Sequence, residues 1–214
     1  MRGVSLALGA GLALLVVGTG LALLRSPLTV AATNRPRDGG EQLLARTRRG
    51  TSYCQGGEGL PRGTSAIRMS LGAAIGPRVR VVVSAAGRTL TSGEQEPAWT
   101  GSVVAVPVRP VRRAFADVTV CADVDPANET LAVFGEHAPP ARAARERGRP
   151  LAGRMWVEYL RPGTRSWASL APSILRNMGF ARAVGGEGIA FLALALLAVL
   201  AVLASRVALA ELRR

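Results

Sequence analysis

The sequence contains no lysine and a single histidine, and both shortages limit the chemistry it can support. All 27 of its basic residues are arginine, a composition typical of GC-rich genomes. His137 lies in the segment Gly135-Glu-His-Ala-Pro-Pro140 with no serine or cysteine nucleophile motif beside it, so we interpret it as an ordinary loop residue. No cluster of His, Cys, Asp and Glu has the spacing of a metal site. The sequence therefore does not favour an enzyme, and we expect no cofactor.

Acidic residues are also few, and they are unevenly placed. Residues 25–50 carry six arginines against two acids, a net charge of +4, and residues 139–182 carry nine against two, a net charge of +7. Residues 51–138 carry eight arginines and eight acids, a net charge of zero. Because a nucleic-acid-binding domain would be expected to carry the basic face itself, we do not expect a nucleic acid partner.

Cysteine is limited to Cys54 and Cys121. An even count in a secreted context favours one disulfide, worth about 4 kcal/mol for this separation. The alternative is two unrelated thiols in a cytosolic domain. Cys121 alternates with Val118 and Val120, so its side chain should leave the core face, and a bridge would join the strands across the outside of a sheet.

Two long apolar runs lie near the ends of the chain. Residues 1–24 are too long for the ~7–15-residue core of a cleaved signal peptide and predict a signal-anchor helix, with cleavage near Val30-Ala31-Ala32 as the alternative. Ile189 to Ala204 contains no charged residue, so residues 185–205 predict a second transmembrane helix followed by a tail at 206–214. Long domains translocate largely regardless of charge, so we expect both termini in the cytoplasm and the middle outside.

Residues 164–184 show one helical stripe before the second apolar run. Its apolar members follow the spacing of a single helix face: Trp167, Leu170, Ala171, Ile174, Leu175 and Met178. Pro172 fits if it lies in the first turn. We expect this helix to lie in the membrane interface, with Arg176 and Arg182 at anionic headgroups; the alternative is packing on the domain.

Residues 51–163 show the two-residue alternation of half-buried strands. The apolar faces are Ile67, Met69 and Leu71; Val79, Val81 and Val83; Val104, Val106 and Val108; Val118, Val120, Ala122 and Val124; Leu131 and Val133; and Met155, Val157 and Tyr159. We predict a mainly β, antiparallel, jelly-roll-like sandwich domain, preceded by a basic linker at 25–50. Pro107 indicates an edge strand or a bulge. Pro139 to Pro150 is typical of a mobile basic loop, and contact with anionic headgroups or wall polymer is the alternative.

Two local patterns suggest binding. Trp99, near Glu94 and Glu96, could stack on a sugar ring while the carboxylates bond its hydroxyls; the alternative is an indole that caps the core. Four acidic residues close in sequence, Asp117, Asp123, Asp125 and Glu129, could hold Ca²⁺, although Asp-x-Asp-Pro-x-Asn is also a common turn composition.

One stretch of about 25 residues carries a resemblance. It contains Val157-Glu-Tyr-Leu-Arg-Pro-Gly163, Ser166-Trp167, Leu170-Ala-Pro172, Arg176 and Gly179, and it resembles small membrane-anchored proteins of actinobacteria. The resemblance implies an N-terminal helix, an extracytoplasmic β domain and a C-terminal span, and it implies no activity. We therefore expect a non-enzymatic accessory or interaction protein of the cell envelope, with anionic lipid and a membrane or envelope protein as partners. The alternative is an extracytoplasmic glycan- or ligand-binding sensor that uses Trp99.

Overall fold

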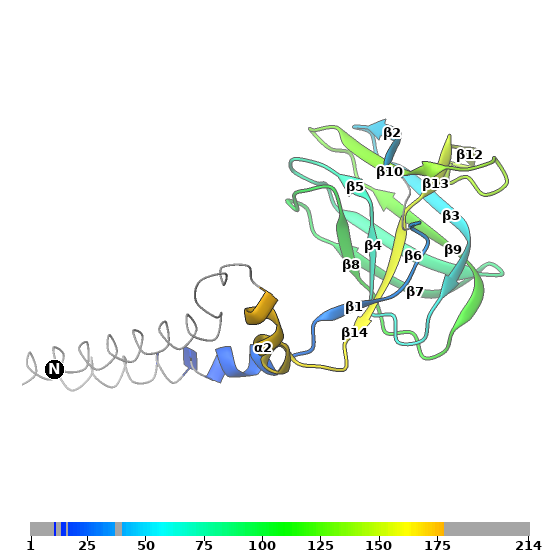
Figure 1. Ribbon diagram of the computed structural model, residues 1–214. Coiled ribbons are helices and arrows are strands. Elements are labelled where there is room, and N and C mark those ends of the chain that lie inside the picture. The colour runs from blue at the N-terminus through cyan, green and yellow to red at the C-terminus, as the bar shows by residue number, and fades with distance from the viewer. Residues whose placement is uncertain (1–10, 12–13, 16, 37–39, 178–214) are drawn as a thin grey trace, which may run out of the picture. The chain divides into compact units, whose positions relative to one another are not determined.

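The computed structural model describes residues 11, 14–15, 17–36 and 40–177 (Figure 1). The chain divides into two units: Leu28–Pro162, and the residues that precede and follow that stretch. The strands given below belong to the first unit, which we call the β domain.

Within its described residues, the β domain forms three antiparallel sheets. The first has the strand order β1-β14-β4-β8, the second β13-β10-β2 with β5 beside β10, and the third β12-β11-β3-β9-β6-β7. In chain order the strands are β1 (Leu28–Thr33), β2 (Gln42–Thr47), β3 (Thr51–Leu60), β4 (Ala66–Met69), β5 (Leu71–Gly72), β6 (Val79–Ala85), β7 (Arg88–Gln95), β8 (Val104–Pro107), β9 (Phe115–Val124), β10 (Leu131–His137), β11 (Arg145–Glu146), β12 (Arg149–Pro150), β13 (Gly153–Met155) and β14 (Val157–Pro162).

At two places a single residue of the chain joins the first two sheets. The chain passes from β4 of the first sheet into β5 of the second, and from β13 of the second into β14 of the first. Trp156 lies at the second crossing and is buried, and the guanidinium of Arg35 stacks over its ring at 4.2 Å from the centroid. The two joined sheets and the six-stranded sheet give an antiparallel arrangement consistent with the predicted β-sandwich.

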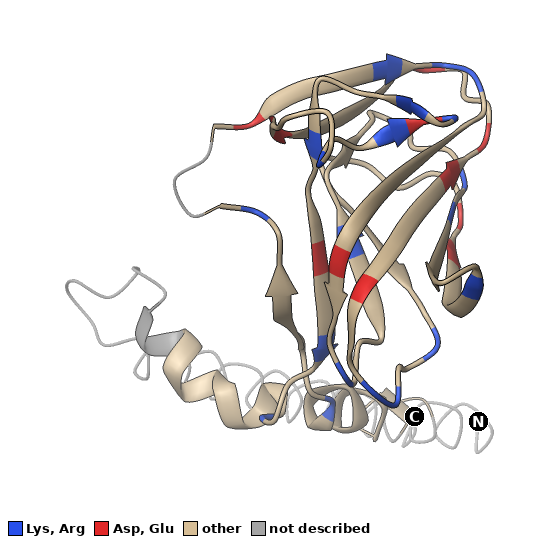
Figure 2. Ribbon diagram, turned by 90° about the vertical axis from the view of Figure 1, so that its right-hand side faces the viewer, with Lys and Arg blue, Asp and Glu red and all other residues tan. Residues whose placement is uncertain are grey.

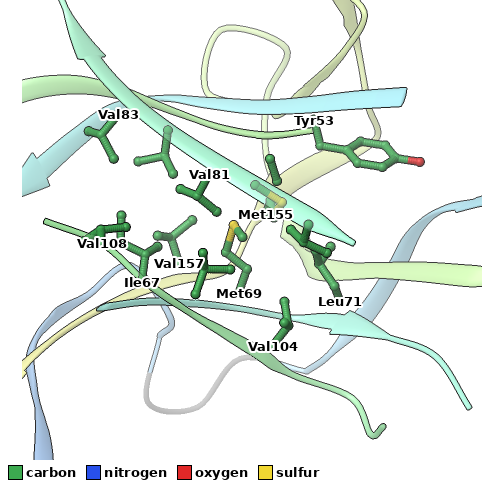
Figure 3. Packing of buried hydrophobic residues seen from close by; sticks show 14 of the residues in the cluster. Tyr53, Ile67, Met69, Leu71, Val81, Val83, Val104, Val108, Met155 and Val157 are labelled. Atoms are coloured by element: carbon green, nitrogen blue, oxygen red, sulfur yellow. The ribbon is translucent and has the colours of Figure 1, made fainter. Parts of the chain in front are cut away.

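The core is built from the alternating faces that the sequence predicts. Val79, Val81 and Val83 of β6 are buried while Arg80 between them is exposed. Figure 3 shows Val81 and Val83 facing Ile67 and Met69 of β4. The remaining predicted core residues are buried as well: Leu71, Val104, Val106, Val108, Val118, Val120, Ala122, Val124, Leu131, Val133, Met155, Val157 and Tyr159. The prediction of these apolar faces is confirmed.

Residues 25–50 are not only a linker, and here the prediction was wrong. Leu28 at the start of β1 pairs with Pro162 at the end of β14, and β2 pairs with β10. The β domain thus begins at Leu28 and not at Thr51. Both strands are only six residues long and pair with strands far along the chain, so their short patterns carry little local signal.

Pro107 lies in β8, the last strand of the first sheet, where it pairs with Ala66. This confirms the edge position that a strand proline requires. The six-stranded sheet comes close to this edge, since Gly93 of β7 forms a bridge with Val108. A Cβ at Gly93 would lie 1.8 Å from the carbonyl oxygen of Pro107, so only glycine fits here.

The second unit contains the helix α2 (Trp167–Asn177) and a helical stretch at residues 17–24. The two parts are hydrogen-bonded: the Trp167 amide donates to the Arg25 carbonyl at 3.0 Å, and the Gly163 amide to the Pro27 carbonyl at 2.8 Å. The hydroxyl of Ser166 accepts from the Ser169 amide and caps α2.

The predicted helix within residues 164–184 is confirmed over Trp167–Asn177, but the helix begins at Trp167, so Pro172 lies beyond the first turn and that part of the prediction was wrong. Trp167 and Ile174 are exposed and Leu170 is half-buried. Met178, Arg182 and the side chain of Arg176 lie outside the described residues, as do residues 185–205 and most of 1–24. Among the helices that the structure describes, none is long and apolar enough to cross a membrane.

Candidate functional site

Strand β3 is the irregular member of the six-stranded sheet. Its pairing with β9 shifts register between Gln55 and Glu58, so Gly56 and Gly57 form a bulge opposite Thr119. Gly57 has a φ of +69°, which glycine adopts without strain. Two polar side chains lie inside the domain on either side of this bulge: Gln55 is 1% exposed and Glu58 is 2% exposed. Each of them requires partners because a buried polar group without a hydrogen bond is costly.

Glu58 finds its partners on the opposing layer. Its Oε1 accepts from Arg154 Nη2 at 2.8 Å, from Arg154 Nε at 3.2 Å and from Asn34 Nδ2 at 2.8 Å. Asn34 also donates to the Met155 carbonyl and accepts from the Val157 amide. The negative charge of Glu58 is therefore balanced by Arg154, and both contacts link β3 to β13 and to the segment after β1.

The hydroxyl of Tyr159 lies buried without a hydrogen-bond partner among the described residues. Burial, and then the negative charge of Glu58, raise the pKa of Tyr159 well above its ordinary value of 10.0, while Arg154 acts in the opposite direction. The hydroxyl therefore stays neutral in the folded protein.

Gln55 joins three parts of the chain. Its Oε1 accepts from the Met155 amide at 3.0 Å, and its Nε2 donates to the carbonyls of Gly56 and Arg142, each at 3.1 Å. These bonds satisfy the buried amide and fix the backbone at Arg142 against the bulge.

Residues 141–150, which we call the arginine hairpin, are ordered by β3. The Arg145 position of β11 pairs with Cys54, and the Arg147 amide donates to the Ser52 carbonyl. Arg147 and Gly148 form the two-residue turn to β12, with φ angles of 46° and 83°. The prediction of a loop was therefore wrong over Arg145–Glu146 and Arg149–Pro150, because strands of two residues leave no alternation to detect.

The arginine hairpin adds a basic edge to the β domain. It carries four arginines, at 142, 145, 147 and 149, and one acid, Glu146, which accepts from the hydroxyl of Thr51. Figure 2 shows basic residues on the short strands at this end of the domain. The arginine excess of residues 139–182 thus lies partly within the domain. The expectation of no nucleic acid partner rested on a neutral domain, so this argument for it no longer holds.

The predicted disulfide between Cys54 and Cys121 is present. The two residues are direct partners in the β3–β9 ladder, with Cα atoms 4.0 Å apart. Both are half-buried, whereas Val120 and Ala122 beside them on β9 are fully buried. The bridge therefore lies on the outer face of the sheet, as the alternation of β9 predicts.

A pocket of about 460 Å³ opens beside the disulfide. It lies between the bulge of β3 and the arginine hairpin, and Arg154 reaches it from β13. Its lining consists of Cys54, Gln55, Gly56, Gly57, Thr119, Ala141, Arg142, Ala143, Arg145 and Arg154. We call it the arginine pocket. With three guanidinium groups and no acid in its lining, it is suited chemically to an anion.

Trp99, the candidate sugar-stacking residue, is half-buried against the core. Its Nε1 donates to the Pro77 carbonyl at 2.7 Å, and a Cβ at Gly76 would lie 2.0 Å from its ring. Glu94 and Glu96 both pair with Arg78, just before β6: Arg78 Nε is 3.0 Å from Glu94 Oε1 and Arg78 Nη2 is 3.5 Å from Glu96 Oε2. These contacts favour the interpretation of Trp99 as a cap on the core.

The acidic residues considered for Ca²⁺ do not gather. Within the part of the chain that the structure describes, no three His, Cys, Asp or Glu side chains are placed to hold a metal ion. Glu129 instead accepts from the Ile75 amide at 3.1 Å. The common-turn interpretation of Asp117, Asp123, Asp125 and Glu129 fits this placement.

Sequence reasoning missed the residues that shape the arginine pocket, namely Gln55, Glu58, Asn34 and Arg154. A glycine pair in a sequence usually indicates a turn, but Gly56 and Gly57 form a bulge that continues the strand. A usable signal was present in Thr51 and Tyr53, because the alternation of a buried face continues from them to Gln55.

Comparison with known proteins identifies no relative: no family model, no curated protein and no solved structure matches the chain. The function is therefore inferred from the residues of the chain itself.

Proposed function

We propose that the chain is a non-enzymatic accessory or interaction protein of the cell envelope. In this proposal it is anchored in the plasma membrane by residues 1–24 and 185–205, with both termini in the cytoplasm and a jelly-roll-like β domain outside. The observation that carries the proposal is the Cys54–Cys121 disulfide in a domain between two long apolar runs. Disulfides persist in oxidising extracytoplasmic compartments and are rare in the cytosol.

Helix α2 supports the membrane part of the proposal. Its exposed residues include Trp167 and Ile174, and both belong to the apolar stripe of the helix. Apolar residues on the outside of an amphipathic helix next to a membrane span favour an interfacial position, with Arg176 and Arg182 at anionic headgroups. The resemblance of residues 157–179 to actinobacterial membrane-anchored proteins agrees with the same layout.

An interaction role is favoured over catalysis by the kind of groups that the domain presents. Its arginine hairpin offers charge and hydrogen-bond donors, which suit recognition of an anionic surface or partner. His137, the one histidine, is an exposed residue at the end of β10. The sequence offers it no nucleophile motif as a neighbour.

Thiol labelling on intact cells tests the topology. A membrane-impermeant maleimide should label Cys54 and Cys121 only after treatment with an impermeant reductant, because the disulfide blocks both thiols. A matched control is Ala210→Cys in a chain that also carries Cys54→Ser and Cys121→Ser, which should label only after lysis. Labelling of the native cysteines after lysis alone, without reductant, would contradict both the topology and an extracytoplasmic bridge.

Quenching by brominated lipid tests the interfacial helix. In vesicles that contain the full-length chain, bromine should quench part of the tryptophan emission, and Trp167→Phe should abolish that part. Trp156→Phe provides the control, since Trp156 is buried in the β domain. Quenching that survives Trp167→Phe would place α2 away from lipid.

A further inference from the structure

The arginine pocket carries positive charge that the protein itself leaves uncompensated. Arg154 is paired with Glu58, but Arg142 and Arg145 form no ion pair with an acid among the described residues. The one side-chain bond of Arg145 given by the structure is from Nη1 to the Gly148 carbonyl at 3.3 Å. Both guanidinium groups are exposed and retain donors for a ligand.

The walls of the pocket are fixed from the interior of the domain. Gln55 holds the Arg142 carbonyl and the bulge, the β3–β11 pairing holds Arg145 beside Cys54, and Glu58 holds Arg154. The disulfide ties the same stretch of β3 to β9. A ligand would therefore meet arginines whose backbone positions are already set, which reduces the entropy lost on binding.

The lining also indicates the chemical nature of the uncharged part of the ligand. It contains the hydroxyl of Thr119 and the backbone of Gly56 and Gly57, with alanine as its apolar part and no aromatic or large aliphatic side chain. An acyl chain would find no apolar wall there, whereas a hydroxylated ligand would find hydrogen-bonding groups. The volume of about 460 Å³ lies in the range of roughly 300–1,000 Å³ that small-molecule pockets occupy.

A second hollow lined by arginines differs from the arginine pocket in its other lining residues. It is lined by Arg88, Arg112 and Arg113 together with Leu90, Pro110, Val111 and Phe115, and the guanidinium of Arg113 already stacks over the ring of Phe115 at 4.9 Å. It also contains the hydroxyl residue Thr89, but large apolar side chains form much of its wall, unlike the wall of the arginine pocket. This hollow supplies a control with the same kind of charge.

We propose that the arginine pocket binds an acidic saccharide, with the carboxylate or phosphate oxyanion of the sugar held by Arg142 and Arg145 and its hydroxyls held by Thr119 and the bulge. Guanidinium groups bind such oxyanions with charge-assisted, often paired hydrogen bonds. The inference deepens the proposed function, on which it rests for the source of the ligand in the envelope. It assigns binding to a site distinct from Trp99.

Binding to the purified full-length protein tests this proposal independently of topology. The probes are trigalacturonate and glucose 1-phosphate, with neutral galactotriose as the reference, measured by titration calorimetry. We expect at least one acidic probe to bind and galactotriose not to bind. Arg142→Gln with Arg145→Gln should weaken binding at least tenfold, as loss of charge-assisted bonds predicts. Arg88→Gln with Arg112→Gln should leave the affinity unchanged.

Several outcomes would overturn the proposal. These are failure of both acidic probes, an equal loss in the control variant, and competition by a single-stranded oligonucleotide that binds tighter than either probe at the same site. A circular-dichroism melt of each variant establishes that the fold is retained. Saccharide binding together with cytoplasmic thiols would refute the envelope proposal alone, and extracytoplasmic thiols without binding would refute this inference alone.

Discussion

Strands β3 and β6 lie on either side of β9 in the same sheet, yet they are built differently. β6 keeps a continuous register with β9 from Val79 to Ser84 and buries one face of valines. β3 shifts register twice against the same strand and buries Gln55 and Glu58 besides Tyr53 and Leu60. One neighbour of β9 follows the simple alternation and the other departs from it.

The difference shows what each strand contributes. Burial of apolar side chains is non-directional, so β6 needs only a complementary surface, which the opposing layer provides. Buried amide and carboxylate groups need partners at defined positions, so β3 also determines where Asn34, Arg154 and the arginine hairpin must lie. The candidate site lies where the alternation of buried and exposed residues along β3 breaks. Substitutions in the two strands should therefore have different effects.

The largest effect is expected from the covalent link between β3 and β9. Cys54→Ser with Cys121→Ser should lower the free energy of unfolding by about 4 kcal/mol, because it releases a loop of 67 residues in the unfolded chain. Chemical denaturation of the full-length protein measures this. A loss below about 1 kcal/mol would contradict the explanation that the bridge stabilises the fold by restricting the unfolded chain.

The next largest effect is expected at Glu58. Glu58→Ala should destabilise the protein by about 3 kcal/mol, because it leaves the Arg154 guanidinium and the Asn34 amide without their acceptor. Arg154 is 25% exposed and can reach water, so the low end of the range for buried pairs applies. Glu96→Ala is the control: Glu96 is 74% exposed, and its loss should cost less than about 0.5 kcal/mol. Equal effects at the two positions would contradict the account of β3.

In β6 the effects should follow burial alone. Val81→Ala should cost about 2 kcal/mol through lost apolar contact and a cavity, and Val82→Ala clearly less, because Val82 is only half-buried on the other face. Thermal or chemical unfolding of the two variants compares them directly. Similar losses at both positions would mean that β6 does not separate a core face from an outer face.

The smallest effect at neutral pH is expected from Tyr159→Phe, which removes a buried hydroxyl that has no partner among the described residues. The free energy of unfolding should change by less than about 0.5 kcal/mol at pH 7. A pH series then separates the variants. Folding raises the pKa of Tyr159, so the tyrosine ionises at a lower pH in the unfolded chain than in the folded protein. The free energy that this difference contributes to folding is fully present below the ordinary pKa of 10.0. It is lost above pH 10.0, where the unfolded chain ionises.

The parent protein should therefore lose more stability than Tyr159→Phe between pH 8 and about pH 11. Unfolding curves at both pH values provide the measurement. A parent and variant that decline in parallel would show that Tyr159 ionises as easily in the folded protein as in the unfolded chain.

The sequence allows the core to be predicted because burial leaves a local trace. Val79, Val81 and Val83 alternate with polar residues whatever their partners are, and the same rule places Cys121 on the outer face of β9. Pro107 marks an edge strand because it lacks an amide hydrogen. These inferences use only the geometry of a single strand, which is why they agree with the structure.

The site could not be predicted in the same way because it depends on pairing at long range. Glu58 and Arg154 are separated by 96 residues, and neither has a sequence neighbour that points to the other. The arginine hairpin is ordered by β3, almost a hundred residues earlier in the chain, through the pairing of Glu146 with Tyr53 and of Arg145 with Cys54. Composition alone describes such a segment as a basic loop.

The pairing of Leu28 with Pro162 has a mechanical consequence. The two ends of the β domain leave from one end of the β1–β14 ladder, so tension between the flanking chain segments would pull β1 from β14 one residue pair at a time, beginning at that end. Unzipping of this kind proceeds at low force, since the hydrogen bonds break in sequence and do not share the load. It would reach Asn34, the residue bonded to Glu58 and Val157, only after β1 has peeled away. Strand β1 would therefore detach before force reaches the rest of the sandwich, and the hydrogen bonds of Asn34 would be the first contacts to resist after it.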